Sequence, residues 1–145
     1  MLAIAALTLA ALFTGAALYV LLAEHPARRQ IAPEAQLAQW KSAYAHGAVM
    51  QASLAFLAGL AGAAVWVRWG DLFFLAGGAV MWSAIAYTFG VMWKLNSRLK
   101  GTPPEAAGAE TVTMLGHWGR LHAGRTLIGL AATGIYAAGL YRALT

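Results

Sequence analysis

The chain has 145 residues, of which 61% are hydrophobic and only 10% charged, so it lacks the polar surface that a soluble domain of this size needs. It is therefore expected to be a small integral membrane protein without a soluble catalytic domain. The absence of cysteine excludes disulfides, thiolate nucleophiles and cysteine-ligated metal or haem. The net charge of +5 would suggest a nucleic-acid partner in a soluble protein, but the basic residues here flank apolar runs, so we expect them to orient the chain in a membrane.

The first apolar run covers residues 2–23 and carries no charge. It is long enough to cross the hydrocarbon core of a bilayer. A cleaved signal peptide is the alternative, but no basic residue precedes the run and the run is longer than a signal sequence requires. The segment Glu24-His25-Pro26-Ala27-Arg28-Arg29 is expected to end this helix at the membrane surface, because a residue before proline is biased out of the α region.

The next segment, residues 30–46, is mixed in polarity. Leu37, Trp40 and Tyr44 recur in it at spacings of three and four residues, which is typical of an amphipathic helix. We expect a short helix that lies in the membrane interface and leads into the second span, residues 47–67.

A short connection, residues 68–71, requires the third span, residues 72–93, to return antiparallel to the second. The polar residues 94–100 are predicted to extend this helix out of the membrane. Two prolines within residues 101–104 then stop it, and the last helix carries the fourth span, residues 118–141.

Four spans predict an all-α, integral membrane four-helix bundle that forms one transmembrane domain, residues 1–145. Such a chain has both termini on one side and its first and third connections on the other. All Lys and Arg residues except Arg68 and Arg142 lie near the first and third connections. By the positive-inside rule those connections face the cytoplasm of a bacterial inner (plasma) membrane and the termini face the periplasm. A homodimer or another membrane partner is left open.

One face of the last helix gathers unusual side chains. Trp118, His122, Arg125 and Gly129 follow at spacings of four, three and four residues, so they share a face, whereas His117 lies elsewhere around the helix. Polar groups where a helix enters a bilayer indicate a functional site. The alternative is an interfacial tryptophan belt with an arginine that reaches the headgroups.

Three other segments are expected to meet this face at the cytoplasmic mouth of the bundle. His25 lies at the predicted proline turn, Asn96 is a neutral residue that topology does not explain, and Tyr44 and Gln51 share a face of the second helix. A buried glutamine also commonly makes an interhelical hydrogen bond. The predicted polar core consists of His25, Asn96, His122 and Arg125, and the predicted substrate contacts are Tyr44, Gln51 and Trp118.

This residue set suits one kind of chemistry. A histidine can act as a general base, and neighbouring cations can stabilise an enolate or phenolate as it forms. We therefore expect proton abstraction from a lipophilic phenol or ketone.

Several motifs resemble, in their order along the chain, the anthrone oxygenase-like family of small four-helix membrane proteins. The motifs are Glu24-His25-Pro26-Ala27-Arg28, Tyr87-Thr88, Asn96 with Leu99, and Trp118 with Leu121-His122-Ala123-Gly124-Arg125-Thr126. Leu95 stands where the family more often has threonine. The resemblance implies four spans and, for the fungal polyketide members, oxidation of an anthrone to an anthraquinone by dioxygen without a cofactor.

Three functions compete at this point. The leading hypothesis is a cofactor-independent membrane oxygenase in which His122 or His25 is the base and Arg125 and Asn96 hold the oxyanion. A redox protein with haem or copper on histidines from different helices is the second. The third is a non-enzymatic subunit or scaffold of a membrane assembly.

Overall fold

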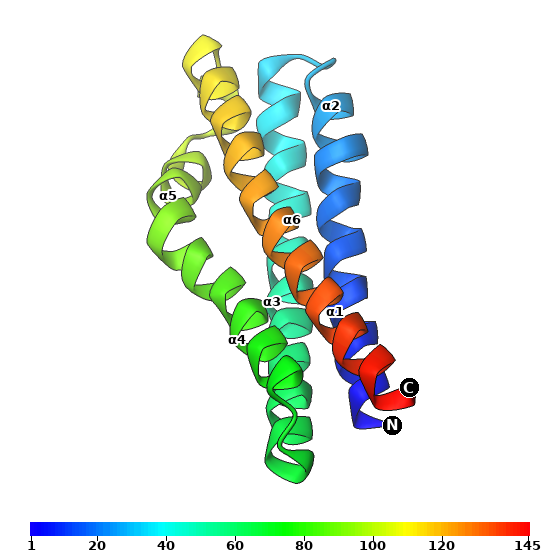
Figure 1. Ribbon diagram of the computed structural model, residues 1–145. Coiled ribbons are helices and arrows are strands. Elements are labelled where there is room, and N and C mark those ends of the chain that lie inside the picture. Colours follow the sequence, from blue (N-terminus) through cyan, green and yellow to red (C-terminus); the bar gives the residue numbers. More distant parts are fainter.

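The computed structural model describes residues 1–145 and contains four long helical rods (Figure 1). Each rod is long and apolar enough to cross a membrane, which confirms the predicted four-helix membrane bundle. The elements are α1 (Leu2–Tyr19), η1 (Val20–Glu24) and α2 (His25–Arg28) in the first rod, α3 (Pro33–Trp69) in the second, α4 (Leu72–Tyr87), η2 (Thr88–Met92) and α5 (Trp93–Gly101) in the third, and α6 (Ala109–Leu144) in the fourth, with a 3₁₀ turn η3 (Pro104–Ala106) before it.

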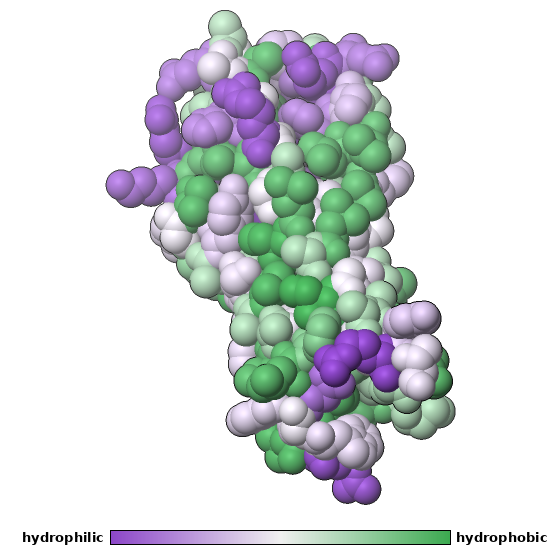
Figure 2. All heavy atoms as spheres, viewed as in Figure 1, coloured by the Kyte–Doolittle hydropathy of each residue, from purple (hydrophilic) through white to green (hydrophobic).

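The rods form a ring in which α1 packs against α3 and α6, and α4 packs against the same two helices. Both termini lie at one end of the bundle, and the first and third connections lie at the other (Figure 1). On the face that Figure 2 shows, hydrophobic residues cover much of the middle of the molecule, and hydrophilic residues gather towards its ends. This pattern fits a multi-pass membrane protein, and the assignment of the two ends to cytoplasm and periplasm stays a prediction.

The first rod does not end at the proline, which corrects our expectation for this segment. His25 has helical dihedral angles (φ −65°, ψ −44°), and its N–H bonds to the carbonyl of Val20 across a π-helical turn. In an α-helix the ring of Pro26 would clash with the carbonyl four residues earlier. The π turn η1 has a wider hydrogen-bond pattern, which changes the direction of the preceding carbonyls. The helix can therefore continue as α2 to Arg28.

The expected separate interfacial helix before the second span is also wrong in detail. Residues 33–46 are the first turns of α3, which runs unbroken from Pro33 to Trp69. Leu37 and Trp40 are fully buried in a cluster with Met92, Leu99, Leu115 and Trp118. The amphipathic face therefore packs against the third and fourth rods rather than against the membrane surface.

The third rod extends past its span as expected and ends at Gly101. A second π turn, η2, separates α4 from α5. The turn between α3 and α4 is short because Gly70 adopts a left-handed conformation (φ 71°) and Asp71 caps the next helix, where its carboxylate accepts from Phe73 N at 2.9 Å.

Tyr136 closes the core at the end of the bundle that holds the termini. Its hydroxyl donates to the carbonyl of Ala58 at 2.8 Å, and its ring packs against Phe74 with centroids 5.4 Å apart. Gly62 and Gly77 provide the space for this ring. Gly134, by contrast, is exposed, and a Cβ there would meet no neighbour.

Gly62→Ala is expected to destabilise the protein by about 1–3 kcal/mol, because an added Cβ would lie 2.6 Å from the carbonyl oxygen of Phe74, a backbone atom that cannot turn aside. The melting temperature in detergent measures the effect. Gly15→Ala is the matched control, since a Cβ there meets nothing within 4 Å. Equal melting temperatures for the two variants would contradict the close packing.

Candidate active site

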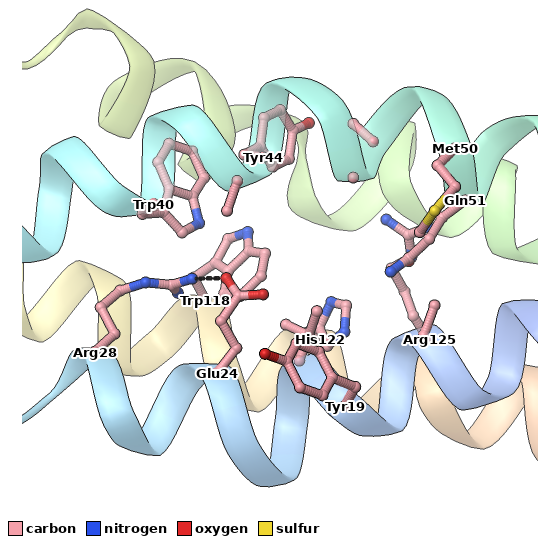
Figure 3. Close-up of a pocket in the computed structure, with 15 residues that line it drawn as sticks. Tyr19, Glu24, Arg28, Trp40, Tyr44, Met50, Gln51, Trp118, His122 and Arg125 are labelled. Carbon is pink, nitrogen blue, oxygen red and sulfur yellow. Dashed lines mark hydrogen bonds and ion pairs between the residues drawn. The ribbon is translucent and has the colours of Figure 1, made fainter.

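A cavity of about 270 Å³ lies between the first rod, α3 and α6. It extends along the bundle from Arg28, Trp40 and Trp118 at one end to Gln51 and Arg125 at the other, with His122 between them (Figure 3). Neither α4 nor α5 contributes to its lining. Three of the four rods therefore build the site.

His122 is 2% exposed and lines the cavity. Its Nε2 lies 3.2 Å from the carbonyl oxygen of Ala17. A carbonyl only accepts hydrogen bonds, so in the neutral imidazole Nε2 carries the proton and Nδ1 carries the lone pair. Nδ1 is buried without a hydrogen-bond partner. The ring of Trp118 stacks on the imidazole with centroids 4.9 Å apart, so both the tautomer and the orientation of this base are fixed.

Arg125 lies on the same face of α6 and is 7% exposed. It forms no ion pair, because the two ion pairs in the protein join Arg28 to Glu24 and Arg98 to Glu110. Its Nε has no hydrogen-bond partner, and its guanidinium carbon lies 5.5 Å from the centroid of the Phe13 ring. A buried cation without a counter-ion costs folding free energy, so this position favours a functional role in binding an anion.

Gln51 and Tyr44 line the cavity from α3, as predicted. Gln51 is 4% exposed and its Oε1 has no hydrogen-bond partner; it does not make the interhelical bond that a buried glutamine commonly makes. Tyr44 stacks on Trp40 with ring centroids 4.9 Å apart. The cavity thus combines aromatic walls with a free amide at the end where Arg125 lies.

Asn96 and His25 are buried but do not line the cavity. The Oδ1 of Asn96 accepts a hydrogen bond from Trp118 Nε1 at 3.0 Å. The ring of His25 lies 6.3 Å from the Trp118 ring and packs against Gly119. The four residues of the predicted polar core therefore separate: His122 and Arg125 face the cavity, and Asn96 and His25 contact Trp118. Their catalytic roles stay predictions.

Glu24 and Arg28 also line the cavity, although neither was among the predicted site residues. The Arg28 guanidinium forms an ion pair with Glu24, and its Nε donates to Oε1 of Gln39 in α3. The two charged residues are spaced i, i+4, which brings them together only on a continuous helix. The spacing could have predicted this ion pair, but the expected end of the helix at Pro26 spoke against it.

Buried polar atoms without a hydrogen-bond partner concentrate at this site. Most buried polar groups in folded proteins are paired, so their concentration indicates where a polar ligand would bind. The affected residues are Arg28, Trp40, Gln51, His122 and Arg125, which line the cavity, and His25 and Asn96, which contact Trp118.

The other two histidines lie away from the cavity. His46 and His117 are exposed, and no three histidine, aspartate or glutamate side chains come together as metal ligands. The absence of a cofactor and the haem or copper alternative both stay predictions.

The sequence model of the family described as anthrone oxygenase matches residues 40–135. The chain belongs to the anthrone oxygenase family. This finding confirms the resemblance and indicates an oxygenase-like role. The matched segment of this anthrone oxygenase family member includes the cavity-lining parts of α3 and α6 but not the first rod. Comparisons with curated proteins and with solved structures find no match.

Proposed function

We propose that this protein oxidises a lipophilic, anthrone-like aromatic ketone or phenol with dioxygen, without a cofactor, in the cavity between the first rod, α3 and α6. One observation supports this most directly: His122, with a free Nδ1, and Arg125, a buried cation without a counter-ion, line the same cavity. They are three residues apart on one helix, which is about 4.5 Å along its axis.

The first step is proton abstraction. Nδ1 of His122 takes a proton from the acidic C–H opposite the ketone oxygen, and the electron pair of that bond moves through the ring to the oxygen. Arg125 stabilises the resulting oxyanion, and the amide of Gln51 adds a polar contact there. A base and a cation three residues apart on one helix match a substrate whose acidic carbon and oxygen lie on opposite edges of one ring.

The second step is the reaction with dioxygen. The electron-rich carbon gives its electrons to O₂ and a carbon–oxygen bond forms, and the peroxide takes the proton from the imidazolium of His122. The carbon then loses its remaining hydrogen as a proton while the O–O bond breaks. One oxygen atom ends in the new carbonyl group and the other in water, so the reaction anthrone plus O₂ gives anthraquinone plus water needs no additional reductant.

Asn96 acts in this proposal through Trp118. Its Oδ1 accepts from the indole N–H, and the indole stacks on His122. Asn96 is thus a positioning residue for the base rather than a ligand of the oxyanion.

Oxygen uptake by the purified protein tests the proposal. With anthrone as substrate, we expect uptake above the rate of autoxidation, one anthraquinone formed per O₂ consumed, and one ¹⁸O atom from ¹⁸O₂ in the product. An absorption spectrum and a metal analysis of the same sample address the haem and copper alternative. Uptake no faster than in buffer, together with a stably co-purifying membrane protein, would favour the subunit function instead.

A further inference from the structure

The cavity has an incomplete wall between the first rod and α3. Two of its lining residues are also largely exposed on the outer surface: Tyr19 is 62% exposed and Met50 is 49% exposed. The small residues Ala16, Gly47 and Ala48 also line the cavity on these two rods. The cavity therefore reaches the side of the bundle at this level.

The end of the cavity at Arg28, Trp40 and Trp118 is closed by contacts between rods (Figure 3). Arg28 of α2 bonds to Gln39 of α3 and pairs with Glu24, and the side chain of Arg28 is 1% exposed. Trp40 of α3 meets Trp118 of α6 edge to face, with ring centroids 5.8 Å apart. A molecule that comes from water along the bundle axis would have to break these contacts.

The surface beside the lateral opening is apolar. Leu22 on the first rod and Val49 on α3 are exposed, next to Tyr19 and Met50. Exposed residues of this kind belong in contact with hydrocarbon rather than water. The buried groups of the site lie behind the opening: His122 and Arg125 line the far wall on α6, and Gln51 lines α3 (Figure 3).

From this arrangement we infer that an uncharged planar aromatic molecule dissolved in the bilayer enters the site sideways, between the first rod and α3, and that Gly47 sets the width of this entrance. The inference rests on the proposed function for the identity of the molecule. It adds that the substrate is drawn from the membrane and that its oxygen enters first, towards Arg125.

Gly47 allows a clean test because a Cβ at this position meets nothing within 4 Å. An added Cβ would thus not clash with the protein, and we expect larger side chains at this position to narrow the entrance. Gly134 offers a matched control: it is exposed within α6, a Cβ there also meets nothing within 4 Å, and it does not line the cavity.

The experiment uses the full chain in phosphatidylcholine vesicles, with anthraquinone as the ligand and quenching of tryptophan fluorescence as the readout, because Trp40 and Trp118 line the cavity. We expect binding to weaken progressively from Gly47→Ala to Gly47→Leu to Gly47→Phe, by about tenfold or more for phenylalanine. Gly134→Phe should bind like the wild type. Melting temperatures identify any variant that does not fold, and the leucine variant then replaces the phenylalanine variant in the comparison.

Two outcomes separate this inference from the proposed function. If the wild type binds anthraquinone in a Gly47-dependent way but does not consume oxygen with anthrone, the entrance is supported and the oxygenase reaction is overturned. If the wild type consumes oxygen and folded Gly47→Phe binds and reacts like the wild type, the entrance is overturned and the reaction stands.

Discussion

Arg125→Met is expected to lower the rate of oxygen consumption by about 10²–10³-fold, the loss that follows removal of one oxyanion-stabilising group. The same change should leave the melting temperature unchanged or raise it. Arg125 is 7% exposed and has no ion-pair partner, and replacing a buried charge with an apolar side chain of similar length removes a desolvation cost. Opposite effects on rate and stability are the signature of a residue kept for function.

Arg120→Met is the matched control, because Arg120 is exposed on the same helix. It should change neither the rate nor the melting temperature appreciably. A large loss of stability in Arg125→Met, with no loss of rate beyond the folded fraction, would show that Arg125 is a structural residue and would remove the main support for the oxyanion site.

His122→Phe is expected to lower the same rate by about 10²–10⁴-fold, the usual contribution of a general base. The phenyl ring has a similar size and keeps the stacking with Trp118, whose ring lies 4.9 Å from the imidazole. It lacks Nδ1 and the contact of Nε2 with Ala17. Oxygen uptake and anthraquinone binding, measured on one sample, separate loss of the base from loss of the cavity: binding should persist while the rate falls.

His117→Phe provides the comparison, since His117 is exposed five residues earlier on α6. Its rate should equal that of the wild type. If His122→Phe retained the wild-type rate, the base would have to be sought elsewhere, and Glu24 is the carboxylate that lines the cavity.

The face of α6 was predictable because it depends only on helical periodicity. Spacings of four and three residues place His122 and Arg125 together and His117 apart, and the structure buries the first two and exposes the third. The four rods were predictable for a similar reason, since the length and hydropathy of each run decide whether it can span a bilayer.

The residues that line the cavity were harder to predict because they depend on contacts between rods. Asn96 was expected to face the substrate, yet the structure directs its side chain to the indole of Trp118. Arg28 lines the cavity beside Glu24 because the first rod passes through Pro26 without a break. A residue before proline does disfavour the α-helical conformation, but the π turn before Pro26 changes the backbone hydrogen bonds so that the helix continues.

The π turn η1 lets α1 and α2, the two parts of the first rod, present their side chains in independent directions. One extra residue in a helical turn rotates everything after it by about 100° relative to an uninterrupted helix. The membrane-embedded part, α1, can therefore keep its packing against α3 and α6 while Glu24, His25 and Arg28 point in a direction that α1 alone would not give them. Changes in length within Val20–Glu24 would therefore turn these polar side chains as a set, while α1 keeps its place in the bundle.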